Sequence, residues 1–251
     1  MTDYDRLHKE WDNVHFECES PTYQMRKKII LMTIEQLFPA RGEYTCLDVG
    51  CGTGDYSFEL SKRNFRVLGF DFSQYAIDKC KQKAQTLGIQ NVHFYSDNIF
   101  QFSTSEKFDL ILISEVLEHI HDDMAILKKY SDYVKSSGYI VVSVPFDQKL
   151  WSYEDEHAGH VRRYTLNRIR EMFINANMEL ITSICYGFPL LHIIWKIKSI
   201  RSTRSKQRTN MVSTSARFLP IKYFGKLIVF FDSLFINSKM GVGIIVVAKK
   251  I

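Results

Sequence analysis

The stretch YTCLDVGCGTG, residues 44–54, begins as an apolar strand and ends as a loop with three glycines. The residues after it, 55–63, have the composition of a helix start. A buried strand that leads through glycines into a helix N-terminus can hold a polar ligand against bare backbone, because the first helical N–H groups have no partner within the helix. The stretch therefore predicts a ligand-binding turn.

The glycine spacing distinguishes this loop from a dinucleotide-binding fingerprint. A G-x-G-x-x-G fingerprint has its third glycine three residues after the second, but the residue three positions after Gly52 is Asp55. An acidic side chain at the start of the helix disfavours a pyrophosphate, which needs positive charge there. The loop therefore predicts a nucleoside ligand without a pyrophosphate.

Apolar strands and helical stretches alternate along the chain. The predicted strands cover residues 44–49, 65–70, 91–95, 108–113, 139–144, 178–186 and 243–248. The predicted helices cover residues 22–38, 55–63, 73–87, 122–135 and 165–176. This alternation is typical of an α/β fold with a parallel sheet and helices on both faces, in which ligands bind at the carboxyl ends of the strands.

Polar residues stand at the carboxyl ends of four predicted strands. They are Asp48, Asp71, Asp97 and Ser114. Each aspartate alone would be typical of a helix cap. Three acids at three successive strand ends favour one shared site at that edge of the sheet.

The glycine loop and the acids after the second and third strands resemble those of the class I S-adenosylmethionine-dependent methyltransferases, over about residues 44–145. The resemblance implies an α/β, Rossmann-like fold with a mostly parallel seven-stranded sheet, an antiparallel last strand and helices on both faces. It implies S-adenosylmethionine as the cofactor. The cofactor-binding residues that it implies are Asp48, Gly50, Cys51, Gly52, Gly54, Asp71, Phe72, Asp97, Asn98, Ile99 and Ser114.

The resemblance gives the acids of this set separate roles. Asp48 would orient the ammonium group of the methionine part, directly or through water. Asp71 would accept hydrogen bonds from both ribose hydroxyls, and Asp97 would accept one from the adenine amino group. Phe72 and Ile99 would lie on the two sides of the adenine ring.

One candidate for the chemistry is the run Glu115-Val116-Leu117-Glu118-His119. On a helix, Glu115, Glu118 and His119 would share a face, and carboxylates with an imidazole suit a divalent metal. A similar run belongs to a metal site in the ubiquinone-type and small-RNA O-methyltransferases, but many family members with this run need no metal. The alternative is solvated acids beside a packed histidine. We predict no bound metal and count His119 among the candidate catalytic residues.

The second candidate is YEDEHAGHVRRY, residues 153–164, whose GHxRRY part resembles a segment of bacterial methyltransferases that modify sugars and lipid-linked intermediates. His160 could be the base for a substrate hydroxyl, and Arg162 and Arg163 could bind a carboxylate or phosphate. The alternative is a loop held by arginine pairs with the acids at 154–156, in which His160 caps the next helix. Both interpretations remain open from the sequence.

Composition limits the class of protein. The chain has 251 residues, 45% of them hydrophobic and 24% charged, as in an ordinary globular protein. Its polar start has no secretory signal, and its five scattered cysteines contain no C-x-x-C motif. We predict a cytoplasmic protein with a single domain, divided into an N-terminal cap (1–43), a cofactor-binding core (44–145) and a substrate-side half (146–251).

The last quarter of the chain is basic. Residues 186–251 carry 12 Lys and Arg but a single acid, Asp232. Within the predicted insertion 187–240, residues 187–200 and 218–236 suit amphipathic helices around an Arg/Ser/Thr-rich loop at 201–217. These helices would form a plain cap over the sheet or a membrane-surface lid. Apolar blocks between the basic residues disfavour nucleic acid.

Together these features predict an S-adenosylmethionine-dependent methyltransferase that acts on a small-molecule or lipid-linked acceptor, with oxygen as the favoured target atom. The alternative is a non-catalytic nucleoside-binding protein that docks on a membrane or a partner enzyme through its basic C-terminal region. The acceptor and the oligomeric state are left open.

Overall fold

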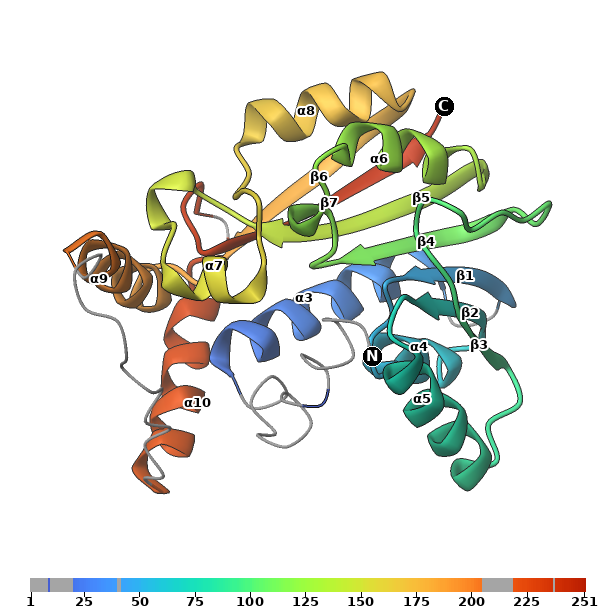
Figure 1. The fold of residues 1–251 in the computed structure, drawn as a ribbon, viewed down its shortest axis with the longest axis horizontal. Helices are drawn as coiled ribbons and strands as arrows, with labels where there is room; N and C mark the ends of the chain where they lie inside the picture. The colour runs from blue at the N-terminus through green and yellow to red at the C-terminus, as the bar shows by residue number, and fades with distance from the viewer. Residues whose placement is uncertain (1–8, 10–19, 40–41, 205–218, 237) are drawn as a thin grey trace.

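The computed structural model describes residue 9 and residues 20–39, 42–204, 219–236 and 238–251, without the side chains of 203–204 and 219–224 (Figure 1). The strands are β1 (Tyr44–Val49), β2 (Phe65–Asp71), β3 (Val92–Ser96), β4 (Phe108–Ser114), β5 (Val134–Pro145), β6 (Met178–Tyr186) and β7 (Gly243–Lys250). The helices are α3 (Pro21–Leu37), α4 (Asp55–Ser61), α5 (Gln74–Leu87), α6 (Asp123–Ser131), α7 (Tyr153–Ala158), α8 (Leu166–Asn175), α9 (Leu190–Arg204) and α10 (Leu219–Ser233), with short 3-10 turns η1 (Leu117–His119) and η2 (Gln148–Leu150).

The strands form one seven-stranded sheet in the order β3-β2-β1-β4-β5-β7-β6. Neighbouring strands are parallel from β3 to β5, whereas β7 is antiparallel to both β5 and β6. The sheet confirms the predicted α/β class, the mostly parallel pairing and the antiparallel last strand.

Both faces of the sheet are covered by helices. Successive residues of a strand point to opposite faces, so Cys46 belongs to a core with α3, α4 and α5, while Leu47 belongs to a core with α6 and α8. Figure 1 shows these two groups of helices on opposite sides of the sheet. Because β1 and β4 are buried on both faces, their sequences are almost continuously apolar.

The predicted helix at 122–135 is too long and the predicted fifth strand too short. Helix α6 ends at Ser131, and β5 begins at Val134. Residues 133 and 134 bond to strand β4 and not to the helix, since Phe108 N donates to Tyr133 O (2.8 Å) and Phe108 pairs with Val134.

The run after β4 does not form the helix on which Glu115, Glu118 and His119 would share a face. Glu115 has a φ of +55° and still pairs with the sheet, because its N donates to Ser143 O (2.9 Å). Only Leu117–His119 turn, as the 3-10 helix η1. Glu115, Glu118 and His119 therefore do not share one helical face.

The two helices predicted within 187–240 are present as α9 and α10, which contact each other while α10 also contacts α3. The predicted amphipathic character is not confirmed for α9, which has apolar side chains on its buried and on its exposed side. Asp232 of α10 accepts hydrogen bonds from Leu190 N (2.8 Å) and Leu191 N (3.0 Å) and so caps α9. Among the described residues, no helix combines the length and the apolar character needed to cross a bilayer. The predictions for residues 1–19 and for the loop at 201–217 fall largely on residues outside the described ranges, and the three-part division of the chain stays a prediction.

A buried carboxylate joins α6 to the segment before α8. Asp123 is 1% exposed, and it accepts a hydrogen bond from Tyr164 OH (2.7 Å) and pairs with Arg162 (2.7 Å) and Arg168 (2.5 Å). Burial alone would raise the pKa of Asp123, but the bonds to Arg168, Tyr164 and Arg162 outweigh burial and lower it.

We expect Asp123→Asn to lower the free energy of unfolding by about 3 kcal/mol near neutral pH, because two guanidinium groups lose their counter-charge. A carboxyl group whose pKa is lower in the folded chain contributes stability above its unfolded pKa of about 4, and this stability is lost as the pH falls further. Urea unfolding should therefore show the difference shrinking in acid. Asp122→Asn is the matched control, since an asparagine at this helix N-cap caps about as well; an equal loss in both variants would contradict the assignment.

Candidate functional site

The glycine loop after β1 has the backbone that only glycine adopts easily. Gly50, Gly52 and Gly54 have φ values of +67°, +52° and +80°. A Cβ on Gly50 would lie 2.5 Å from a methyl group of Val116, and one on Gly54 would lie 2.9 Å from Phe58. The loop is therefore a bare backbone surface by steric necessity.

Asp48 lies beneath this loop. It is 2% exposed, and its Oδ2 accepts a hydrogen bond from Ser57 Oγ of α4 (2.6 Å). Burial raises the pKa of Asp48 to about 7, against the hydrogen bond from Ser57, and the nearby charge of Asp71 raises it further. The carboxyl group is thus placed to respond to a cation that approaches the loop.

Asp71 connects the ends of β1 and β2. Its Oδ2 accepts a hydrogen bond from Gly52 N (2.9 Å) and its Oδ1 accepts one from Ser73 N (2.8 Å). The structure therefore gives Asp71 a role in shaping the loop, and the predicted ribose contact stays a prediction.

Asp97 follows β3 and lies beside the end of β2, because its N donates to Asp71 O (3.0 Å). Its Oδ1 accepts a hydrogen bond from Asn98 N (2.7 Å), and Asn98 Oδ1 accepts one from Phe100 N (2.9 Å), so both side chains shape the turn. Phe72 is 45% exposed at the neighbouring strand end.

Ile99 is partly buried, and its carbonyl accepts a hydrogen bond from Tyr130 OH (2.9 Å). The predicted pairing of Phe72 and Ile99 around an adenine ring stays a prediction.

The ends of β4 and β5 are linked to α3. Ser114 Oγ lies 2.9 Å from Ser143 Oγ, and Ser143 Oγ donates to Glu115 Oε1 (3.2 Å). Arg26 of α3 pairs with Glu115 Oε2 (2.9 Å). Sequence reasoning missed Arg26, since a single arginine in a helix gives no local sign of this contact.

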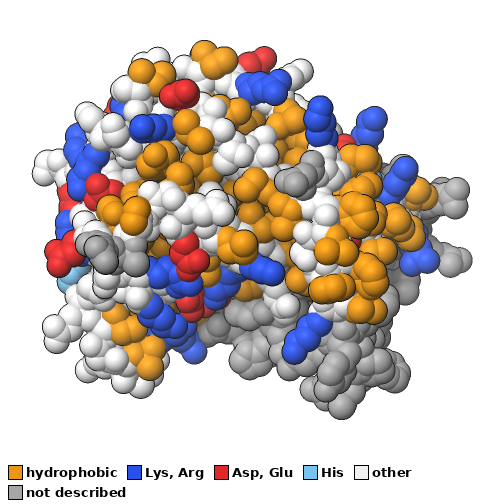
Figure 2. Space-filling view, turned by 180° about the vertical axis from the view of Figure 1, so that it is seen from behind, with side chains coloured by type: hydrophobic (Ala, Val, Ile, Leu, Met, Phe, Trp, Pro, Cys, Tyr) orange, Lys and Arg blue, Asp and Glu red, His pale blue; other side chains and the backbone are white. Residues whose placement is uncertain are grey.

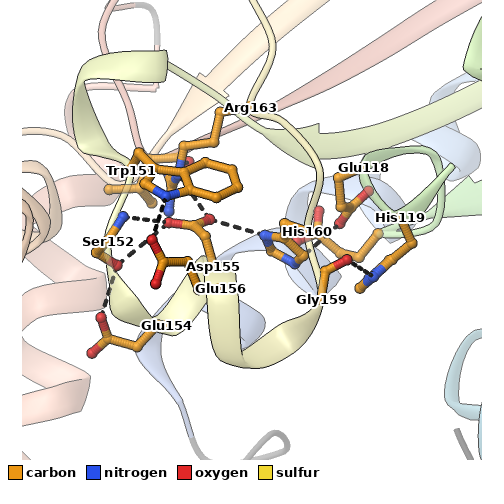
Figure 3. A network of polar contacts seen from close by, with 12 residues as sticks. Glu118, His119, Trp151, Ser152, Glu154, Asp155, Glu156, Gly159, His160 and Arg163 are labelled. Carbon is orange, nitrogen blue, oxygen red and sulfur yellow. Dashed lines mark hydrogen bonds and ion pairs between the residues drawn. The ribbon is translucent and has the colours of Figure 1, made fainter. Parts of the chain in front are cut away.

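His160 is oriented by a buried carboxylate (Figure 3). Asp155 is 1% exposed, and its Oδ1 lies 2.9 Å from His160 Nδ1 and accepts a hydrogen bond from Arg163 Nε (2.9 Å). With Nδ1 held by Asp155, Nε2 is left toward Glu118, whose Oε1 lies 3.9 Å away. A carboxylate that fixes one ring nitrogen leaves the other available as a base or a ligand.

The structure contains parts of both interpretations of residues 153–164, the catalytic one and the structural one. Arg163 pairs with Asp155, as the structural alternative expected, but Arg162 pairs with Asp123 of α6 instead. Both guanidinium groups are thus engaged within the protein, so the expectation that they bind a substrate anion is not supported. Thr165, and not His160, caps α8.

Glu118, His119 and His160 form a cluster whose possible ligand atoms all lie within 4.8 Å of one another. Glu118 is 0% exposed, and neither carboxylate oxygen has a hydrogen-bond partner among the described residues. Burial, together with the charge of Glu115, raises the pKa of Glu118. Burial and His160 lower the pKa of His119 to about 4. A buried carboxyl group without a partner is neutral or meets a cation, so this donor set fits a divalent metal.

A small cavity of about 60 Å³ adjoins this cluster. It is lined by Thr22, Glu115, Pro145, His160, Arg163, Tyr186, Trp195 and Val242. The Trp195 ring of α9 lies 4.5 Å from the Arg163 guanidinium. The cavity thus brings together the region after β4, the loop with His160 and the C-terminal helices, and the role of Trp195 could not be read from sequence periodicity.

Comparison with known proteins gives sequence matches over part of the chain. A family model described as "Methyltransferase domain" matches residues 41–182. A demethylmenaquinone methyltransferase from Oceanobacillus iheyensis is 30% identical over 145 residues, 55% of this chain and 60% of the relative. A ubiquinone biosynthesis O-methyltransferase from Coxiella burnetii is 32% identical over 114 residues, 45% of this chain and 48% of the relative. The chain thus spans between 48% and 60% of the length of these curated relatives.

Solved structures show the same fold. The N-methyltransferase NodS from Bradyrhizobium japonicum WM9, in complex with S-adenosyl-L-homocysteine, has a TM-score of 0.55 at 21% identity and covers 68% of this chain and 83% of its own. A putative sarcosine dimethylglycine methyltransferase from Galdieria sulphuraria has a TM-score of 0.64 at 11% identity, covering 91% and 86%. These likenesses confirm the Rossmann-like fold.

The pKa of Asp48 leads to a test of the site's electrostatics. An acid whose pKa is raised in the folded chain loses stability as the pH rises from its unfolded pKa of about 4 to its folded pKa, which is about 7 here. We expect Asp48→Asn to gain stability relative to the wild type by about 1 kcal/mol for each pH unit in this window. Urea unfolding from pH 4 to pH 8 measures the difference. Ser57→Ala removes a hydrogen bond that lowers this pKa, so it should extend the decline to higher pH. Parallel curves for all three proteins would contradict the assignment.

Proposed function

The chain belongs to the methyltransferase domain family, and from this premise we propose that it transfers a methyl group from S-adenosylmethionine to a small-molecule or lipid-linked acceptor, with oxygen as the target atom. One observation carries the proposal. The glycine loop with Asp48 and Asp71 lies at the same edge of the sheet as the strand end that leads to Glu118, which is 3.9 Å from His160. This arrangement supports a nucleoside site and a proton-accepting group at one edge of the sheet.

The cofactor half would bind through backbone and carboxylates. The loop at 50–54 would approach the methionine part and the ribose, where any side chain on Gly50 or Gly54 would collide with its neighbours. Asp48, whose pKa is about 7, would be held ionised by the ammonium group of the cofactor. When bound, S-adenosylmethionine supplies a methyl group on a cationic sulfur.

The protein's own contribution would be alignment and proton removal. Methyl transfer to an alkyl hydroxyl needs a base, and His160 Nε2 is the nitrogen that Asp155 leaves available. Asp155 would hold the ring in this tautomer and stabilise the imidazolium once a proton is taken. His160 is 14% exposed in its side chain, so bulk water competes little for this nitrogen.

The acceptor is proposed from the relatives and from the cavity. The two curated relatives are named for demethylmenaquinone and for ubiquinone biosynthesis. In this chain, Tyr186 and Trp195 line the cavity next to His160, and aromatic walls suit an apolar or aromatic acceptor. The names of the relatives support a quinone-type acceptor, and the cavity of about 60 Å³ would contact only a small part of such a molecule.

A second role for the histidines is supported by the carboxylate of Glu118, buried without a hydrogen-bond partner among the described residues. Glu118, His119 and His160 would hold a divalent cation, which when bound would lower the pKa of an acceptor hydroxyl. The non-catalytic alternative has no comparable support, because a pure binding protein has no need of a histidine oriented by a buried acid.

Cofactor binding is tested by calorimetric titration. We expect the chain to bind S-adenosylmethionine and S-adenosylhomocysteine but not NAD. Asp97→Ala should weaken binding about tenfold, because one charge-assisted hydrogen bond is lost. Asp78→Ala, on the exposed side of α5, is the control and should bind as the wild type does. Tight NAD binding without S-adenosylmethionine binding would end the proposal.

The role of His160 is tested by turnover to S-adenosylhomocysteine with hydroxylated quinone precursors. We expect His160→Ala to lower kcat about 100-fold or more, with cofactor affinity unchanged. His157→Ala is the matched control, since His157 is exposed three residues away and stacks on Tyr153. A loss of less than threefold would dismiss His160 as the base. Activity that disappears with a chelator and returns with Mg²⁺ or Mn²⁺ would assign it to a metal site instead.

A further inference from the structure

An apolar surface covers the outward sides of α9 and α10. We define the α9–α10 face by Ile193, Ile197, Ile200, Leu227, Phe230 and Leu234, which are between 45% and 65% exposed. Figure 2, viewed from behind, shows hydrophobic side chains gathered on the side of the molecule that carries α9 and α10 in Figure 1. Large side chains gathered in this way mark a surface that meets an apolar partner.

Helix α10 is apolar on two sides. Ile228 is 5% exposed and packs into the core, while Leu227 and Phe230, three residues apart, face outward. Exposed Leu234 follows directly after the end of the helix. A helix that only covers a globular core has polar residues on its outward side. The outward side of α10 therefore has no explanation in the packing of the described residues.

The charges around the face are positive. On α9, Ile193, Ile197 and Ile200 form a stripe, and helical geometry puts exposed Lys196 on one side of it and exposed Arg201 on the other. Exposed Lys226 borders the outward side of α10. An apolar stripe with a cationic border is the pattern of a helix that lies in the interface of an anionic membrane.

No acid of these two helices opposes that charge. Asp232 is the single acidic residue in the sequence of α9 and α10. It is 1% exposed, and it accepts hydrogen bonds from Leu190 N and Leu191 N. A protein partner is favoured by mixed charges and hydrogen-bonding groups at the border, whereas this face offers apolar side chains and cations.

We propose that the α9–α10 face docks on the surface of a membrane that contains anionic lipids, with the apolar side chains entering the interface and Lys196, Arg201 and Lys226 meeting the headgroups. The two helices act as one platform, since Asp232 joins α10 to the start of α9. The docking itself does not depend on methyl transfer.

Docking would also orient the candidate site. Lys198 of α9 pairs with Glu154 of α7 (2.8 Å), and Trp195, on the inward side of α9, lines the cavity with His160. A membrane-bound α9 would therefore hold this cavity close to the lipid surface. This consequence, unlike the docking, rests on the proposed function, and it suits an acceptor with a lipid tail.

Vesicle flotation with the full chain tests the proposal. We expect co-flotation with vesicles of phosphatidylcholine and phosphatidylglycerol, and much less with phosphatidylcholine alone. Phe230→Ser/Leu234→Ser should lower partitioning about tenfold or more on anionic vesicles, because two apolar anchors are lost. Lys196→Gln/Arg201→Gln should lower it about tenfold, and added salt should remove the difference.

Matched controls lie on other faces. Leu87→Ser/Ile174→Ser removes exposed apolar side chains of α5 and α8, and Lys81→Gln/Arg170→Gln removes exposed cations of the same helices. Both should float as the wild type does, and all variants should keep its thermal unfolding midpoint and its affinity for S-adenosylmethionine.

Absence of binding to anionic vesicles at low salt would overturn the proposal, as would equal losses in test and control variants. Sedimentation velocity tests whether a second copy of the chain, and not a membrane, binds the α9–α10 face. A wild-type dimer that Phe230→Ser/Leu234→Ser converts to a monomer, with no change in flotation, would also overturn it. Loss of cofactor binding or turnover with intact flotation would count against the proposed function alone.

Discussion

The hydrogen bond from Gly52 N to the Asp71 carboxylate ties the loop after β1 to the end of β2. The loop can make this bond only because its three glycines take positive φ values without side-chain collisions. Once the loop has this course, α4 begins at Asp55 and Ser57 lies over Asp48. Two acidic side chains therefore lie next to the glycine loop: Asp48, which is buried beneath it, and Asp71, which holds its backbone.

A second carboxylate organises the other half in a similar way. Asp155 binds both His160 and Arg163, and Arg163 in turn contacts the ring of Trp195. A buried acid with a permanent cation beside it stays ionised, and the bonds to His160 and the charge of Arg163 lower the pKa of Asp155 despite its burial. Asp155 lies against Nδ1 of His160, so the other ring nitrogen, Nε2, faces Glu118. The orientation of one imidazole thus depends on contacts that reach from α7 to α9.

Much of the fold could be predicted from the sequence, because it depends on local patterns. Continuous apolar runs predicted the buried strands, and the glycine spacing predicted the loop. The resemblance to class I S-adenosylmethionine-dependent methyltransferases is confirmed by the family model. The sequence was less informative where distant contacts decide. Val134 falls within the predicted helix 122–135, but in the structure it pairs with Phe108 of β4. Glu115 is not helical because its N–H donates to Ser143 O. The partners of Arg162 and Arg163 depend on tertiary approach, which no spacing in the chain encodes.

The reversed direction of β7 has a consequence for how this molecule can diverge. The chain leaves the sheet after Tyr186 and returns at Gly243, which pairs with Tyr186 across the two strands. The chain therefore leaves and re-enters the sheet at two paired residues, and residues 187–242 lie between these two positions in the sequence. Because the two ends of this segment pair with each other, a change in its length does not require a change in the register of β6 and β7, and the entropy of closing a longer loop grows only slowly with its length. Under the proposed function and the proposed docking, acceptor binding and membrane attachment would both involve this one segment, which is separate in sequence from the glycine turn.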